Sequence, residues 1–270
     1  MTLNWKRWLS LVFIGVLTAC SGLAPSPTPQ PPTPTITQTP TITPTIIWFP
    51  PTETPQPLPT RVLEPTPNLR PAQGNILLED AFSKAEQWIT GTLAAGNMAV
   101  SNQSLTLAVQ QSKASLQTYR LTNEVYGDFY LSVDASPSLC RGEDTYGILF
   151  RLNSQWDYYR FLIRCDGYAR VERVRNSQTV LMEDWVFVGG NTGALANVNL
   201  GVWAYGSEMR FFVNDFYLFT TNDPVFINGQ VGFFARSIGE DALTVTYKNL
   251  TIRALNPSEI PPTPTWTPLP

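Results

Sequence analysis

Tyrosine and arginine side chains gather in one short stretch of the sequence, where their spacing is compatible with a surface for sugars. In a strand, successive side chains point to opposite faces, so Tyr158, Arg160 and Arg164 share one face. Arg151, on the preceding strand, is expected to join them, and Trp156 lies in the turn between the two strands. Aromatic rings suit the apolar faces of pyranoses, and guanidinium groups fit carboxylates or sulfates. These five residues form a candidate ligand-binding surface for sugars, acidic sugars in particular.

The same arginines have a plainer interpretation. Residues 141–175 contain seven arginines and five acidic residues. Cross-strand pairing with Asp157, Asp166 and Glu172 would give an ordinary solvated sheet surface of little energetic value, and this interpretation is favoured. Trp156, in turn, can fold back over the sheet edge instead of contacting a ligand.

Catalytic chemistry finds little support in the residue types. The chain has no histidine, which excludes Ser/His/Asp and Cys/His catalytic sets and His-ligated metals. Glycosidases usually need two carboxylates about 5–10 Å apart, whereas the close acids here are adjacent and point to opposite faces of a strand. A pair assembled across strands stays open, so hydrolase activity remains an alternative to a non-catalytic module. Net charge −3 argues against nucleic-acid binding.

Calcium is the one metal for which the sequence offers candidate ligands. Asp80, Asp223 and Asp241 are expected in loops or at strand ends, where carboxylates can bind calcium, but their spacing carries no calcium-site information. No other cofactor is implied.

Residues 74–255 are expected to form the domain that positions these side chains. Runs with a two-residue period, bounded by turn residues, recur along it, and no helical period persists. The clearest runs are 104–109, 128–135, 146–152, 158–165, 168–175, 199–205, 209–213, 230–235 and 243–253. About a dozen such strands predict an all-β, two-sheet antiparallel sandwich. Trp88, Trp185 and Trp203 are interpreted as packing residues in it.

Cys140 and Cys165 flank the predicted hairpin of this domain. In an exported protein their placement favours a disulfide that closes a loop of about 25 residues, with two separate buried thiols as the alternative.

The first residues indicate export to a membrane surface. Lys6 and Arg7 precede an apolar run that is too short to span a bilayer but suits a signal peptide. The run ends in Leu17-Thr18-Ala19-Cys20, which resembles the lipobox of bacterial lipoproteins. That resemblance implies a signal peptide over 1–19, lipid on Cys20 and a membrane-anchored protein at the bacterial cell surface; an ordinary secretory signal is the alternative.

Two Pro/Thr-rich segments flank the domain. Residues 21–73 contain 16 of the 24 prolines and few charges, so 20–73 is expected to be a disordered, extended stalk. The tail, 256–270, repeats this composition and is expected to be disordered as well.

The ordered series of motifs in the domain resembles a known fold family. Gly147-Ile-Leu-Phe-Arg151, Tyr158-Tyr-Arg-Phe-Leu-Ile163, Asp166-Gly-Tyr168 and Gln230-Val-Gly-Phe-Phe-Ala235 are similar to motifs of the concanavalin A-like lectin/glucanase jelly roll, in its laminin G-like and 3-keto-disaccharide-hydrolase-like branches. The resemblance implies a jelly roll, which hosts lectins, adhesion modules and hydrolases alike. The E-x-D-x-x-E motif of family 16 glycoside hydrolases is absent from this sequence. We therefore expect a non-catalytic carbohydrate-recognition or adhesion module. The alternatives are a carbohydrate-active hydrolase of the 3-keto-disaccharide hydrolase-like type and a protein-interaction or structural domain of the envelope.

Overall fold

The computed structural model describes residues 68–260; the signal peptide, Cys20 and most of both Pro/Thr-rich segments lie outside the described residues. Strands dominate this folded body, and no α-helix occurs within it. The elements are β1 (Gln73–Asp80), η1 (Ala85–Gln87), β2 (Gly91–Leu93), β3 (Gly96–Ser101), β4 (Ser104–Val109), β5 (Ser115–Tyr119), β6 (Phe129–Leu139), β7 (Thr145–Ser154), β8 (Asp157–Arg164), β9 (Tyr168–Arg175), β10 (Gln178–Phe187), β11 (Val198–Tyr205), β12 (Glu208–Val213), β13 (Phe216–Asn222), β14 (Gln230–Arg236), β15 (Leu243–Leu255) and η2 (Pro257–Glu259). Among residues 68–260, no helix is long and apolar enough to cross a membrane.

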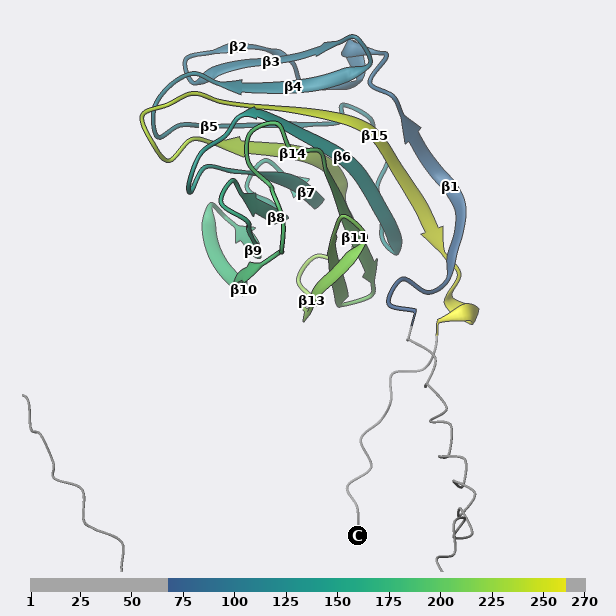
Figure 1. Cartoon of the computed structure of the whole chain (residues 1–270). Helices are drawn as coiled ribbons and strands as arrows, with labels where there is room; N and C mark the ends of the chain where they lie inside the picture. Colours follow the sequence, from purple (N-terminus) through teal and green to yellow (C-terminus); the bar gives the residue numbers. More distant parts are fainter. Residues whose placement is uncertain (1–67, 261–270) are drawn as a thin grey trace, which may run out of the picture. The chain divides into compact units, whose positions relative to one another are not determined.

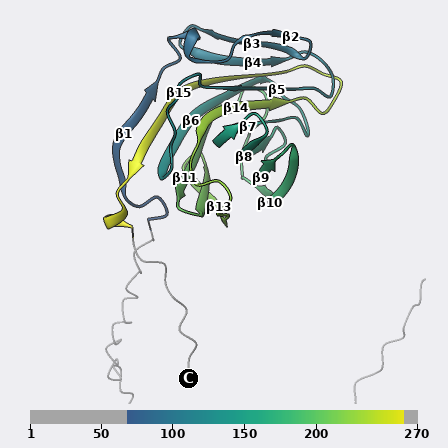
Figure 2. The ribbon, with the colours of Figure 1, turned by 180° about the vertical axis from the view of Figure 1, so that it is seen from behind.

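The strands form two antiparallel sheets packed as a jelly-roll sandwich, which confirms the predicted fold class. The large sheet has nine strands in the order β13-β12-β11-β6-β15-β4-β3-β2, with β1 paired to β15. The small sheet has six strands in the order β10-β9-β8-β7-β14-β5. The large sheet arches from β2 past β15 and β6 to β13, and the small sheet lies within this arch (Figures 1 and 2).

Alternation along the strands builds the core between the two sheets. On β8, Tyr159, Phe161 and Ile163 point inward and are completely buried, as their spacing predicts. Burial of each such side chain contributes roughly 1.5–3 kcal/mol. Phe211 of the large sheet lies with its ring centre 5.0 Å from that of Phe161. The inner face of the small sheet is therefore buried in the core. The outer face of this sheet is available for a binding site.

The folded body extends beyond both predicted boundaries of the domain. The indole Nε1 of Trp203 donates a hydrogen bond of 3.0 Å to the carbonyl of Pro71, and Ile260 packs on the same outer face of the large sheet. Residues 68–73 and 256–260, predicted to be disordered, therefore belong to the fold. Composition alone misassigned them because the contacts that hold them come from distant strands.

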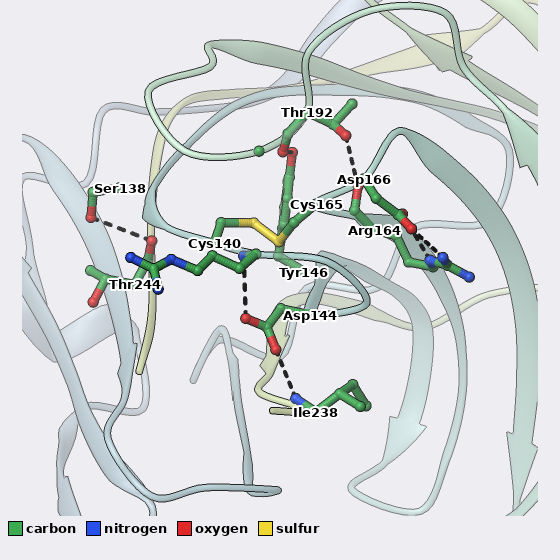
Figure 3. Close-up of a disulfide and its surroundings, with 12 residues drawn as sticks. Ser138, Cys140, Asp144, Tyr146, Arg164, Cys165, Asp166, Thr192, Ile238 and Thr244 are labelled. Carbon is green, nitrogen blue, oxygen red and sulfur yellow. Dashed lines mark hydrogen bonds and ion pairs between the residues drawn. A yellow bond between two sulfur atoms is a disulfide. The ribbon is translucent and has the colours of Figure 1, made fainter. Parts of the chain in front are cut away.

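Cys140 and Cys165 form the predicted disulfide, with their Cα atoms 5.5 Å apart (Figure 3). Cys140 directly follows β6 of the large sheet, and Cys165 directly follows β8 of the small sheet. The bond therefore ties the two sheets together at one end of the sandwich.

Candidate functional site

The outer face of the small sheet contains a hollow of about 210 Å³. Five strands contribute to it, β7, β8, β9, β10 and β14, together with the loops before β7 and after β14. Its lining residues are Glu143, Thr145, Arg160, Leu162, Arg164, Arg170, Trp185, Phe234, Arg236 and Ile238.

Strand register explains the apolar floor of the hollow. Phe234 on β14 pairs with Gly147 on β7. Gly147 pairs in turn with Leu162 on β8, and Leu162 pairs with Arg170 on β9. These positions form one row across the sheet and share its outer face. Gly147 has no side chain, so the row is open between Phe234 and Leu162, both of which are nearly fully buried.

A second row places two arginines on either side of a threonine. Arg236 on β14 pairs with Thr145 on β7, and Thr145 pairs with Arg164 on β8. Because neighbouring strands lie about 4.8 Å apart, the backbones at Arg236 and Arg164 are separated by about 10 Å. The hollow therefore lies between guanidinium groups that belong to strands far apart in the sequence.

Three of the four arginines in the hollow are held by carboxylates. Glu172, 2% exposed, forms ion pairs with Arg160 through one oxygen and with Arg170 through the other. Arg164 forms an ion pair with Asp166, and this hydrogen-bonded contact raises the pKa of the arginine. Ion pairs with nearby acidic residues, the interpretation favoured from the sequence, thus hold Arg160, Arg164 and Arg170 in place. Asp157, also expected to pair with arginine, accepts hydrogen bonds from a serine hydroxyl and a backbone amide instead.

The aromatic rings of the hollow lie against the same arginines. The guanidinium carbon of Arg160 is 5.2 Å from the ring centre of Phe234. Those of Arg164 and Arg170 are 5.0 and 4.3 Å from the ring centre of Trp185. These are cation–π distances, so the rings and acids together orient the arginines. The surface that a ligand meets is therefore rich in hydrogen-bond donors over an apolar floor.

Asp144, which lies close to the disulfide in Figure 3, joins the loops at one rim of the hollow. The Asp144 carboxylate accepts hydrogen bonds from the backbone amides of Arg141 (3.3 Å) and Ile238 (2.8 Å), and its own carbonyl accepts one from the amide of Cys165 (3.0 Å). Three loops are thereby joined. Glu143 and Ile238, which line the hollow, lie in two of these loops.

The structure brings together only part of the predicted ligand-binding set. Arg160 and Arg164 line the hollow. Tyr158 shares their face but is buried beside the hollow, where its hydroxyl donates to Gln117 at 3.3 Å and burial raises its pKa. Trp156 is 52% exposed in the β7–β8 turn and does not line the hollow.

The prediction for Arg151 is wrong. Its side chain is completely buried and does not join Arg160 and Arg164 on the outer face of the small sheet. Its guanidinium donates hydrogen bonds of 3.1 Å to the carbonyls of Phe226 and Gly127, and burial lowers its pKa. The cause is a register irregularity in β7 between Phe150 and Ser154, where Arg151 adopts a φ of 47°. Such a bulge changes which face the following side chains occupy.

Trp185, Phe234 and Arg236 are site residues that sequence reasoning missed. The position of Trp185 in the sequence predicts a packing residue, yet the side chain is half-buried and contributes to the wall of the hollow. Phe234 and Arg236 lie on β14, which pairs with β7 although about 80 residues separate them in the sequence. Alternation along β14 puts Phe234 and Arg236 on one face, but only the strand order places β14 next to β7 and one strand away from β8.

The three calcium candidates lie in different places and have different partners. Asp80 accepts hydrogen bonds from Phe82 N (2.7 Å) and Trp88 Nε1 (3.1 Å). Asp223 forms an ion pair with Arg173, and Asp241 lies 3.0 Å from the guanidinium of Arg141. Within residues 68–260, no group of three or more Cys, Asp or Glu residues is arranged to hold a metal ion.

The large sheet also carries a wide polar depression, of about 460 Å³, on its outer face. Its polar groups largely satisfy one another: Asn199 Nδ2 donates to Ser132 Oγ (3.0 Å) and Asp134 (2.8 Å), and Arg70 binds Asp215. The hollow of the small sheet is the better candidate because apolar, aromatic and cationic groups converge on it.

No known protein family and no curated protein matches the sequence. Solved structures match the fold. A Bacillus subtilis protein of unknown function with a galectin-like fold gives a TM-score of 0.52 at 12% identity, over 68% of this chain and 97% of its own. This chain has a jelly-roll fold. A prokaryotic β-1,3-1,4-glucanase (lichenase) from a mouse hindgut metagenome gives 0.52 at 10% identity, over 66% of this chain and 99% of its own. The Bacillus licheniformis β-glucanase gives 0.51 at 11% identity, over 68% and 99%.

Proposed function

We propose that the folded body is a non-catalytic carbohydrate-binding module and that it binds a glycan in the hollow of the small sheet. The convergence of arginines, Trp185 and an apolar floor on one hollow carries this proposal. Guanidinium groups can donate hydrogen bonds to sugar hydroxyls, while the half-buried Trp185 offers an apolar edge to a sugar ring. The occurrence of the same fold in two glucanases is consistent with this function.

The acids of the hollow favour binding over hydrolysis. Both oxygens of Glu172 are occupied by Arg160 and Arg170, so this carboxylate holds arginines in place. Glu143 is the only carboxylate among the lining residues, whereas glycoside hydrolysis usually requires two.

A glycan array tests this function. The probe is the chain from residue 20 onward with Cys20→Ser, which prevents lipidation and leaves the folded body intact. We expect binding that is weakened by Trp185→Ala, whereas Trp156→Ala, a matched change at an exposed tryptophan outside the hollow, leaves binding unchanged. Weakening by Trp156→Ala alone would move the site to the β7–β8 turn. Release of new reducing ends from a bound glycan would favour the hydrolase, and silence across the array would favour a protein partner in the envelope.

We also propose that the protein is exported and lipid-anchored at the bacterial cell surface through Cys20. The basic start, the apolar run and the cysteine in lipobox register support this. Two or more acyl chains anchor a protein stably, so mass spectrometry of the membrane-extracted protein should find a lipid on Cys20. Cys20→Ser should release the protein from the membrane fraction, and unchanged fractionation of this variant would contradict the anchor.

A further inference from the structure

We propose that the glycan bound in the hollow carries an anionic substituent, a carboxylate or a sulfate ester, and that Arg236 binds it. The inference rests on the proposed function and deepens it by naming the class of glycan.

Arg236 differs from the other arginines of the hollow in having no acidic partner. Arg160 and Arg170 share Glu172, and Arg164 is held by Asp166. Arg236 is exposed at the end of β14 and forms no ion pair with any residue in the described range, 68–260. Glu143, also in the hollow, adds a third carboxylate against four guanidinium groups. The group therefore carries one positive charge in excess, and Arg236 is the arginine among the four that forms no ion pair within residues 68–260.

The rings of the hollow offer limited stacking area to a neutral sugar, because arginines already lie against them. Arg160 lies over Phe234, and both Arg164 and Arg170 lie close to Trp185. Arg236, by contrast, is exposed, and its guanidinium N–H groups bind carboxylate and sulfate oxygens more strongly than neutral hydroxyls.

The second row gives the anion a position. Thr145 lies between Arg236 and Arg164 in register across three adjacent strands. An anionic group above Thr145 therefore has a guanidinium on each side. Glu143 opposes it: this carboxylate lies 3.4 Å from Arg164 and is 66% exposed. Its removal is expected to help an anionic ligand, because Arg164 keeps its pair with Asp166.

The experiment is a glycan array, followed by titration calorimetry, in which each sugar backbone is presented in neutral, uronate and sulfated form. The uronate and sulfate arms distinguish the two sources of negative charge. Arg236→Gln should weaken binding of the anionic form by about tenfold or more, the loss of one charge-assisted hydrogen bond. Glu143→Gln should strengthen it by about threefold, the scale of an exposed charge interaction. A merely structural role for either residue would not produce these opposite signs.

Arg253→Gln is the matched control, since it removes the same charge from the outer face of the large sheet and should leave binding unchanged. Equal binding of neutral and anionic forms, unaffected by Arg236→Gln, would overturn the anionic class and leave the proposed function standing. Binding of no glycan of either kind would overturn both. Equal weakening by Arg236→Gln and Arg253→Gln would show a non-specific charge effect and would also overturn the role of Arg236.

Discussion

Glu172 should be the side chain on which the arrangement of the hollow most depends. It is 2% exposed and is shared by Arg160, 13% exposed, and Arg170, 27% exposed. Glu172→Gln keeps the shape of the side chain but leaves two guanidinium groups facing a neutral amide. Removing one partner of a buried ion pair costs about 3–5 kcal/mol. Because the side chain of Arg170 is 27% exposed, water can solvate it in part. We therefore expect Glu172→Gln to lower the free energy of unfolding by an amount at the lower end of this range, about 3 kcal/mol.

Urea unfolding followed by circular dichroism measures this loss against the roughly 5–15 kcal/mol that stabilises a typical domain. Asp166→Asn is the control, because it breaks the more exposed pair with Arg164, in which the side chains are 32% and 16% exposed. Such a pair is worth about 0–1 kcal/mol. High salt should shrink the Asp166 effect and leave the Glu172 effect nearly unchanged.

A loss of stability for Glu172→Gln no larger than that for Asp166→Asn would contradict this prediction, since it would mean that water solvates Glu172. A triple variant separates charge from packing. Replacing a buried ionic triad with apolar side chains is often close to neutral for stability. Arg160→Met, Arg170→Met and Glu172→Met together should therefore regain most of the stability and still lose glycan binding.

Three further predictions concern the framework of the site. Asp80→Ala should cost about 3 kcal/mol in urea unfolding, because it removes a buried carboxylate that accepts the indole N–H of Trp88 (3.1 Å); a change under about 1 kcal/mol would show that water replaces it. Replacing Cys140 and Cys165 by serine should cost about 3 kcal/mol, since the bond closes a loop with a sequence separation of 25, and an unchanged unfolding midpoint would contradict this. Burial raises the pKa of Tyr159 to about 12, so its neutral form is favoured by folding. Stability should therefore decline above about pH 10, where the unfolded tyrosine ionises, and less so in Tyr159→Phe; parallel pH profiles of the two proteins would argue against this role.

Regular strands were predictable from the sequence because their side chains alternate without interruption. β9 and β4 have the predicted bounds, Tyr168–Arg175 and Ser104–Val109. On β8, the inward Tyr159 and the outward Arg160 and Arg164 follow from a period of two alone. Two of the four arginines of the hollow, Arg160 and Arg164, could therefore be placed on the outer face from the sequence alone.

Irregular strands hid the rest of the site. A bulge in β7 buries Arg151, and no residue type near this position indicates from the sequence that the strand contains a bulge. β10 has register shifts on both sides of Glu183, so the face of Trp185 cannot be read from alternation. The neighbours of β8 in the sheet are fixed by long-range pairing, which leaves no local trace in the sequence. For that reason, the sequence alone does not reveal that Arg236 is the arginine of the hollow without an acidic partner.

Binding and stability are coupled on the outer face of the small sheet, because one layer serves both. Leu149 and Leu162 lie on this outward face yet are almost fully buried. Side chains such as Arg160 cover them, so an arginine that binds ligand also shields an apolar cluster from water. From within the core, the Tyr247 hydroxyl accepts a hydrogen bond from the amide of Gly147 (3.1 Å), and its single proton lies within reach of the carbonyls of Phe234 (3.0 Å) and Gly147 (3.2 Å). These contacts keep the floor of the hollow in place. A loss of glycan binding in any variant of this layer thus identifies a ligand contact only when its unfolding midpoint matches that of the unsubstituted protein.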